Sequence, residues 1–401
     1  MSRSIRWIPC AMAVAFTAAC GDFDPPPITP PVMFRTYVSL GTSLSMGWMN
    51  DGVFGATQQM AWPSRLAGAA TANFELPLIA EPGCQPPYAS PLGSFKRVDG
   101  TSIAASSVCA PLEAGVSLAT TNNFAIEGAY ASDALTATPN APRAGKGPIT
   151  SRVLEPTMSQ VTTMLARKPT FVSVEFGGNE LLQAQGGVLV ENVTYIPFAA
   201  FQEAYGKIID SVKTTRARAV LVGLALDMRQ FPAIRTGPEI WSQRAAFAGF
   251  NVAVAGNCET SPNFMFIRGI VPTAIITGAG RAAAGLGPAT LSCADVPGQV
   301  DYVLTPADIQ FLNALAAQMD AEIQSLAQQN RYAFFRLDVL YAQSKDGVPF
   351  SLAAYLGSAT PYGPAISLDG VHPNSVGQTI LANAAISAIN AAYNVRMNPV
   401  N

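Results

Sequence analysis

The sequence predicts an α/β protein with a mainly parallel sheet, because strand-like stretches alternate with helical ones along the chain. Residues 171–176 alternate and are rich in β-branched and aromatic side chains, and residues 219–226 form a continuous apolar run. Between them, apolar residues within 198–212 recur at steps of three and four, the period of one helix face. In such sheets, functional residues gather beyond the carboxyl ends of the strands.

The remaining elements follow from local patterns along the chain. Thr305-Pro306-Ala307-Asp308 is typical of a helix start, with an N-cap, a proline in the first turn and an acid at the third position. Asn374 provides a similar cap for a final helix. The other expected elements are a strand at 36–40, helix-compatible sequence up to residue 66, a short strand running into a glycine turn within 122–133, a helix at 158–167 and a last strand at 332–337.

Composition favours one exported, globular domain. Of 401 residues, 49% are hydrophobic and 12% are charged, against about 25% charged in ordinary domains. The net charge of −2 excludes nucleic acid as an expected partner, because phosphate binding needs a basic patch. No repeat is apparent, so we expect one domain over residues 34–401. Two irregular, Gly- and Pro-rich insertions are expected within it, at about 75–121 (the first insertion) and 229–300 (the second insertion).

The amino-terminal residues resemble an export signal. Residues 1–20 combine a short basic start with a mostly apolar run and small residues before Cys20. Small residues followed by cysteine resemble the lipobox of bacterial lipoproteins, although Thr17 stands where leucine is usual. We therefore expect lipidation of Cys20, with residues 21–33 as a Pro-rich tether to the membrane of the cell envelope. Ordinary secretion is the alternative.

Four cysteines remain, namely Cys84, Cys109, Cys258 and Cys293. An even number in an oxidising compartment suggests two disulfides, for which three connectivities are possible. The sequential pairing closes the shortest loops and is preferred. With one histidine and no Cys-x-x-Cys motif, neither a metal nor a cofactor is expected.

Five residues together fit nucleophilic acyl transfer. His372 is the only histidine in the chain, and imidazole is the side chain that titrates near neutral pH. Asp369, three residues upstream, is placed to orient it, and Ser43, after the first strand, supplies a hydroxyl nucleophile. The Ser43 N–H, the Gly128 N–H and the Asn179 carboxamide offer donors for an oxyanion.

These segments resemble the ordered blocks of the SGNH (GDSL) hydrolase family. In this chain the blocks are Gly41-Thr42-Ser43, Gly128-Ala129, Gly177-Gly178-Asn179-Glu180 and Asp369-Gly370-Val371-His372-Pro373. The resemblance implies a flavodoxin-like α/β/α sandwich of three layers around a five-stranded parallel sheet. It also implies Ser43 as nucleophile, His372 as general base, Asp369 as its partner, and an oxyanion hole of Ser43, Gly128 and Asn179.

Two positions depart from the family pattern. Thr42 and Glu180 each replace an aspartate, so we expect a cost in loop ordering but no loss of chemistry. The Gly-x-Ser-x-Gly motif of α/β-hydrolases and the dinucleotide-binding Gly-x-Gly-x-x-Gly after the first strand are both absent.

The expected function is cleavage of carboxylic esters, as an esterase or lipase acting on a small-molecule or lipid ester. The second insertion is interpreted either as a lid or acyl pocket, or as a disulfide-pinned decoration. A polysaccharide O-acetyl esterase of the same family is the alternative, followed by a non-catalytic surface lipoprotein that uses the fold for binding.

Overall fold

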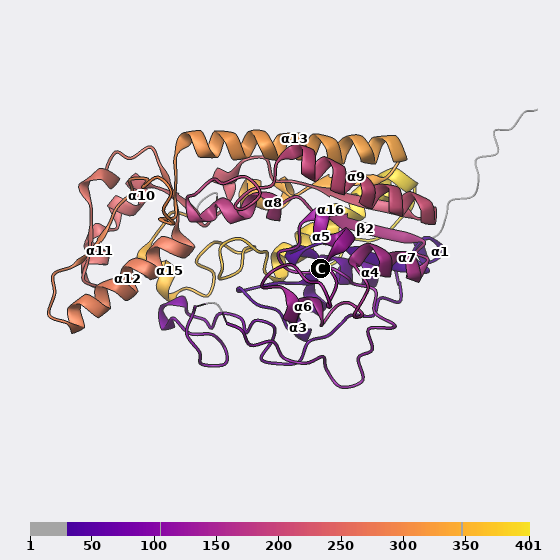
Figure 1. Cartoon of the computed structure of the whole chain (residues 1–401), viewed down its shortest axis with the longest axis horizontal. Coiled ribbons are helices and arrows are strands. Elements are labelled where there is room, and N and C mark those ends of the chain that lie inside the picture. Colours follow the sequence, from indigo (N-terminus) through magenta and orange to yellow (C-terminus); the bar gives the residue numbers. More distant parts are fainter. Residues whose placement is uncertain (1–29, 105, 346–347) are drawn as a thin grey trace, which may run out of the picture.

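The computed structural model describes residues 30–104, 106–345 and 348–401 (Figure 1). The expected signal at 1–20, the lipidation site Cys20 and the tether up to residue 29 lie outside these described residues. Within them, no helix has the combination of length and hydropathy that crossing a membrane would require.

A parallel sheet forms the centre of the molecule, as the sequence predicts. Its strands are β1 (Tyr37–Leu40), β2 (Phe171–Glu175), β3 (Arg218–Gly223) and β9 (Ala333–Arg336). They lie in the order β1-β2-β3-β9, and each neighbouring pair is parallel. Buried apolar residues fill these strands, which explains their continuous apolar sequence.

The expected fifth strand is reduced to an extended segment beside β1, so the main sheet has four strands rather than five. Ser39 donates its N–H to the Asn122 carbonyl at 2.9 Å and accepts from the Phe124 N–H at 2.9 Å. Only one residue pair, Ser39 with Asn123, forms a bridge. The Asn123 side chain accepts from the Ala125 N–H, and this local bond competes with regular pairing.

Helices cover both faces of the sheet and complete three layers (Figure 1). On one face, α4 (Trp62–Ala69) and α16 (Ser375–Tyr393) pack on alternate strand residues such as Phe171 and Val220. The opposite face is covered by α7 (Gln160–Arg167), α9 (Phe198–Thr215) and α13 (Pro306–Asn330), with α5 (Ala131–Thr136) packed against α7 and α9.

The predicted caps begin the two longest C-terminal helices. Thr305 Oγ1 accepts from the Asp308 N–H at 3.2 Å, and Asp308 Oδ2 accepts from the Thr305 N–H at 2.8 Å, a reciprocal capping box. Asn374 Oδ1 accepts from the Val376 N–H at 2.9 Å. Both caps satisfy N–H groups that have no partner inside the helix.

The first insertion has little regular structure, as expected. It contains one short 3₁₀ turn, Leu92–Ser94, and isolated bridges. The predicted disulfide between Cys84 and Cys109 is present.

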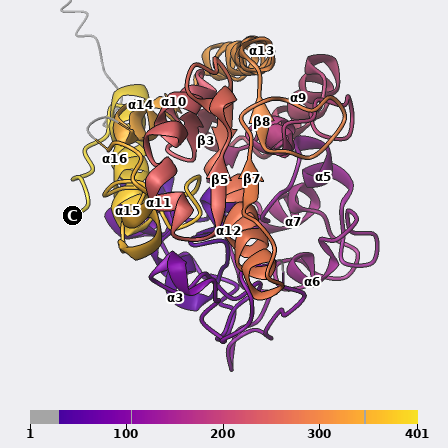
Figure 2. The same ribbon diagram turned by 90° about the vertical axis from the view of Figure 1, so that its left-hand side faces the viewer.

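The second insertion is more regular than expected (Figure 2). Its strands are three residues long, too short for a periodic signal. In α12 polar and apolar residues are not separated onto opposite faces, and Pro272 interrupts the pattern, so no helical period stands out. Two small sheets form, in the orders β4-β6-β8 and β5-β7. The elements are β4 (Ile234–Thr236), α10 (Gly237–Ser242), α11 (Arg244–Ala248), β5 (Val252–Val254), β6 (Phe264–Phe266), α12 (Ile267–Ala283), β7 (Ala289–Leu291) and, just beyond, β8 (Val303–Leu304).

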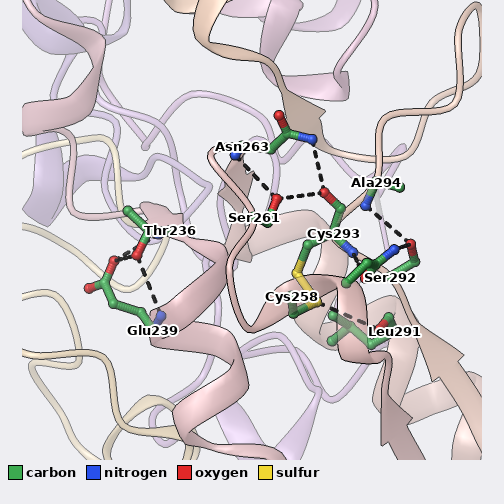
Figure 3. Close-up of a disulfide and its surroundings, with 10 residues drawn as sticks. Thr236, Glu239, Cys258, Ser261, Asn263, Leu291, Ser292, Cys293 and Ala294 are labelled. Carbon is green, nitrogen blue, oxygen red and sulfur yellow. Dashed lines mark hydrogen bonds between the residues drawn. A yellow bond between two sulfur atoms is a disulfide. The ribbon is translucent and has the colours of Figure 1, made fainter.

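A disulfide joins two loops of the second insertion (Figure 3). It links Cys258 with Cys293, the second predicted pair. The Cys293 carbonyl accepts from the Ser261 hydroxyl at 3.2 Å and from Asn263 Nδ2 at 3.0 Å. The bridge therefore ties the segment before β6 to the segment after β7.

Short helices occupy the remaining loops. They are α1 (Pro30–Met33), α2 (Ser43–Met46), α3 (Gly55–Met60), α6 (Gly147–Thr150), α8 (Asn179–Leu182), α14 (Asp338–Ser344) and α15 (Leu352–Gly357). Three of them, α2, α8 and α14, begin within four residues of the ends of β1, β2 and β9, at the edge where the candidate site lies.

Candidate active site

Three side chains from opposite ends of the chain meet beyond the carboxyl end of β1. Ser43 begins α2, while Asp369 and His372 lie in the loop before α16. Ser43 Oγ lies 2.9 Å from His372 Nε2, and His372 Nδ1 lies 3.1 Å from Asp369 Oδ2. All three are buried, Asp369 completely. The arrangement gives the serine proton an acceptor and the imidazole an acidic neighbour.

The Asp369 carboxylate is fixed mainly by donors other than the imidazole. Its Oδ1 accepts from the backbone N–H groups of Val371 and His372, at 2.9 and 2.8 Å. Its Oδ2 accepts from the Ser367 hydroxyl at 2.9 Å and from the Asp51 N–H at 2.8 Å. Oδ2 also lies 3.1 Å from His372 Nδ1, but this contact does not have hydrogen-bond geometry.

Charge and burial act in opposite directions on Asp369. Burial alone would raise the pKa of the Asp369 carboxyl. The neighbouring His372 imidazole, the hydrogen bonds that the carboxylate accepts and the Arg268 guanidinium together hold that pKa well below its usual range. Asp369 is therefore ionised at neutral pH, which is the state that a partner of a general base needs.

A buried glutamate holds the serine turn. Glu175, the last residue of β2, accepts from the Thr42 N–H at 3.0 Å and from the Thr42 hydroxyl at 2.8 Å. It also accepts from the Ser45 hydroxyl at 3.0 Å. Burial raises the pKa of Glu175, and these hydrogen bonds oppose the rise. Thr42 is therefore held in place by a carboxylate supplied by β2.

Asn179 and the Gly128 loop are joined next to the serine. Asn179 Nδ2 donates to the Ala129 carbonyl at 3.0 Å, which leaves its second N–H for another acceptor. Gly128 has a φ of +72°, and a Cβ there would lie 2.7 Å from Lys146 Nζ, so the turn requires glycine. Asn179 lines the cavity at Ser43, whereas Gly128 is not among the described residues that line it.

Glu180 also has a defined role in this region. Its Oε1 accepts from the Ala131 N–H at 2.7 Å, at the start of α5. Its other oxygen has no hydrogen-bond partner among the described residues. Burial raises the pKa of Glu180 to about 7. Glu180 thus fixes the end of the Gly128 loop, in a state that is protonated below neutral pH.

An apolar cavity opens beside Ser43 and His372. Its walls come from the ends of β2, β3 and β9 and from the start of the second insertion, including Leu181, Leu182, Leu224, Met228, Phe231 and Leu337. A second apolar cavity shares Leu181, Leu182, Met228 and Phe231 with it and continues to Phe266, Leu304 and Leu312. The space beside Ser43 and His372 is therefore mainly apolar.

No metal site accompanies the cavity. In the part of the chain that the structure describes, no three His, Cys, Asp or Glu residues cluster as ligands for an ion.

Sequence patterns did not single out three charged residues of this region. Glu175 lies within the strand predicted at 171–176, and an acid in an otherwise apolar strand is a usable signal, because buried carboxylates are rare without partners. Asp51 and Arg268 carry no comparable signal, because they meet only in the folded chain.

Comparison with known proteins finds likeness only among solved structures. No known family model and no curated protein sequence matches the chain. The chain is similar to the extracellular lipase of Streptomyces rimosus, with 13% identity and a TM-score of 0.36 over 89% of this chain and 98% of that one. It is similar to an acetyl-xylooligosaccharide esterase from Geobacillus, with 11% identity and a TM-score of 0.36 over 90% and 96%.

A third similar structure comes from Parabacteroides merdae and is described as a GDSL-like lipase. It has 11% identity and a TM-score of 0.33, over 88% of this chain and 94% of that one. At these values the chemistry has to be argued from the chain's own site. The chain is an α/β protein similar to solved lipases and an esterase, one of them described as GDSL-like, over nearly nine-tenths of its length.

Proposed function

We propose that this protein is a serine hydrolase of the SGNH (GDSL) type that cleaves carboxylic esters with apolar acyl groups. The observation that carries the proposal is the 2.9 Å contact of Ser43 Oγ with His372 Nε2 at the mouth of an apolar cavity. The four sequence blocks that resemble this family supply every residue of the proposed machinery. Ester hydrolysis requires no group beyond these side chains and water.

The first half of the reaction is acylation of the serine. His372 Nε2 takes the Ser43 proton as Oγ attacks the ester carbonyl, and Asp369 stabilises the imidazolium that forms. The Ser43 N–H, the Gly128 N–H and the Asn179 amide hold the oxyanion of the tetrahedral intermediate. His372 then gives the proton to the leaving alkoxide, and the alcohol departs from the acyl-enzyme.

The second half regenerates the enzyme. A water molecule loses its proton to His372 Nε2 and attacks the acyl carbonyl, and the same donors hold the second oxyanion. Collapse of this intermediate returns the proton to Ser43 Oγ and releases the carboxylic acid. Because only neutral imidazole accepts a proton, kcat/KM should rise with pH as His372 deprotonates, and a flat profile from about pH 5 to 9 would contradict the assignment.

The cavity favours an esterase or lipase over a carbohydrate deacetylase. Apart from Ser43, His372 and the polar residues Thr42, Glu175, Asn179 and Tyr341, the side chains in its walls are aliphatic residues, Met228 and Phe231, which suit an acyl chain. Phe231 belongs to the second insertion, so we propose that the beginning of this insertion forms part of an acyl pocket. The polysaccharide O-acetyl esterase and the non-catalytic binding protein remain as outcomes of the test.

The test is hydrolysis of p-nitrophenyl acetate, butyrate and palmitate by the full chain and by Ser43→Ala. We expect turnover by the parent and a loss of roughly a thousandfold or more in the variant, with unchanged circular dichroism. Turnover that survives in Ser43→Ala would contradict the triad. Release of acetate from acetylated glycans without hydrolysis of butyrate would favour the carbohydrate esterase, and no turnover by the folded parent on any ester would favour a binding protein.

For localisation, we propose that the protein is exported and anchored by lipidated Cys20. The two disulfides support an oxidising compartment. Metabolic labelling with palmitate in a bacterial host tests this anchor: the parent should incorporate label and Cys20→Ser should not. Soluble, unlabelled parent in the medium would indicate ordinary secretion instead.

A further inference from the structure

A tight turn that follows α2 is hydrogen-bonded to the loop that carries Asp369 and His372. Residues 49–52 form a two-residue hairpin in which Asn50 and Asp51 have φ of 53° and 58°, a conformation that asparagine and aspartate tolerate better than most residues. Asn50 Oδ1 accepts from the Leu368 N–H at 2.8 Å, and its own N–H donates to Ser367 Oγ at 3.1 Å. The Asp51 N–H donates to Asp369 Oδ2 at 2.8 Å. The serine segment and the histidine loop are thus joined directly.

Both insertions hold the side chain of Asp51. Arg97 from the first insertion lies 2.7 Å from Asp51 Oδ2 and also donates to the Asp51 carbonyl at 3.1 Å. Gln85, from the same insertion, donates to Oδ2 at 2.6 Å. Arg268, at the start of α12 in the second insertion, forms an ion pair with Asp51 Oδ1. Asp51 is 8% exposed and Arg97 is 1% exposed, so the cluster is largely shielded from water.

We propose that Asp51 is a positioning residue for the triad acid, and that Arg97 and Arg268 fix its orientation and balance its charge. The proposal rests on the proposed serine hydrolase function, and it assigns the two insertions a shared task in that reaction. Asp51 does not touch the reacting atoms. Its N–H orients Asp369, and the net charge of the cluster sets how strongly the nearby imidazolium is stabilised.

The net charge of the cluster predicts in which direction each variant should move the titration midpoint of His372. Asp51 with two arginines carries a net charge of about +1 beside the Asp369–His372 pair, and this charge opposes protonation of the imidazole. Losing Arg268 brings the cluster to about zero, whereas losing the Asp51 carboxylate brings it to about +2. The other titratable groups here are Tyr341 and Tyr362 near Asp369, Glu175 near Tyr341, and Tyr88 beside Arg97 and Arg268. None of them is substituted in these variants, and Tyr88, whose pKa burial raises to about 12, stays neutral near neutral pH.

The single histidine makes the experiment direct. In the full chain labelled at histidine, the one imidazole signal belongs to His372, so its NMR titration needs no assignment and no substrate. We expect Arg268→Gln to move the titration midpoint of this signal to higher pH by about 0.5 to 1 unit. The acid limb of kcat/KM should move with it, a three- to tenfold loss of activity below the midpoint.

Two further variants test whether the shift in the His372 midpoint comes from the change in charge or from a general loss of structure. Asp51→Asn keeps the backbone N–H but removes the carboxylate, and should move the midpoint to lower pH. Arg281→Gln removes a positive charge from the same helix, at an exposed side chain that bonds the Gly287 carbonyl, and should leave the midpoint unchanged. If Asp51→Asn fails to fold by circular dichroism, Arg268→Gln and Arg281→Gln still decide.

Different results would overturn the positioning role of Asp51 and the proposed hydrolase function. A midpoint that stays in place or falls in Arg268→Gln, or that moves the same way in Arg268→Gln and Asp51→Asn, overturns the positioning role. Failure of the proposed function has a separate signature, since the parent would then lack Ser43-dependent hydrolysis whatever the NMR titration shows.

Discussion

The two insertions reach the same carboxylate by different structural means. The first has almost no regular structure, and its contact, Arg97, is fully buried, with its guanidinium also bonded to the carbonyls of Pro86, Ile103 and Ala104. The second builds small sheets and a long helix, and its contact, Arg268, keeps 22% of its side-chain surface exposed. The irregular segment thus contributes a fully buried arginine, whereas the ordered segment contributes one that is partly exposed.

A second contrast concerns the cavity beside Ser43. Residues of the second insertion line the two adjoining apolar cavities, and no described residue of the first insertion does. An insertion can therefore contact Asp51, next to the triad, without lining the cavity beside Ser43. Variants in each insertion can therefore be matched against one another.

The largest effect is expected from Arg97→Gln. Removing it leaves Asp51 with one cationic partner and several buried carbonyls without donors, so the free energy of unfolding should fall by about 3–5 kcal/mol. Arg268→Gln should cost less, because Arg268 is 22% exposed and Asp51 keeps its contacts with Arg97 and Gln85. Urea unfolding of both variants measures the difference, and equal losses would show that burial does not separate the two arginines.

The disulfides give the next comparison. They close loops of similar length, with separations of 25 and 35 residues, so replacing either pair by serine should cost about 3–4 kcal/mol. Activity should separate them, because Gln85, the neighbour of Cys84, bonds Asp51 directly. Under conditions where both variants stay folded, kcat should fall more in Cys84→Ser/Cys109→Ser. A larger fall in Cys258→Ser/Cys293→Ser would reverse the comparison.

Glu180, a buried residue outside both insertions, should make the free energy of unfolding depend on pH. With the pKa of Glu180 raised to about 7 in the folded chain, its protonated form stabilises the fold fully below about pH 4.5. That contribution, about 3 kcal/mol, is lost as pH rises through about 7. Glu180→Gln should remove this slope from urea unfolding measured between pH 5 and 8. The exposed Glu191→Gln is the control, and a parent-like slope in Glu180→Gln would contradict the buried-acid assignment.

The smallest expected effect is on acyl-chain preference. Phe231 stands between the two apolar cavities, so Phe231→Ala should join them and raise the rate on palmitate relative to butyrate about tenfold. Phe250→Ala, in the same insertion but partly exposed and away from both cavities, is the matched control. An unchanged ratio in Phe231→Ala would show that the acyl chain does not reach this side chain.

Local patterns in the sequence determined the strands of the main sheet, its helices and the triad candidates. Periodicity reports burial of a continuous segment, which is why β2, β3 and α9 were predictable, and caps are local, which is why α13 and α16 were. Ser43, Asn179 and His372 stood out because strand ends and a single histidine can be recognised without knowing any contact.

Only the tertiary structure decided which groups support that machinery. The pairing of Asp51 with Arg268 spans 217 residues, and the bond of Asp51 to Asp369 spans 318, so no local pattern encodes either. The order within the second insertion was also hidden, because its three-residue strands are stabilised by pairing rather than by their own periodicity. Short segments and isolated charges acquire their roles from distant partners, and those partners are set by the fold.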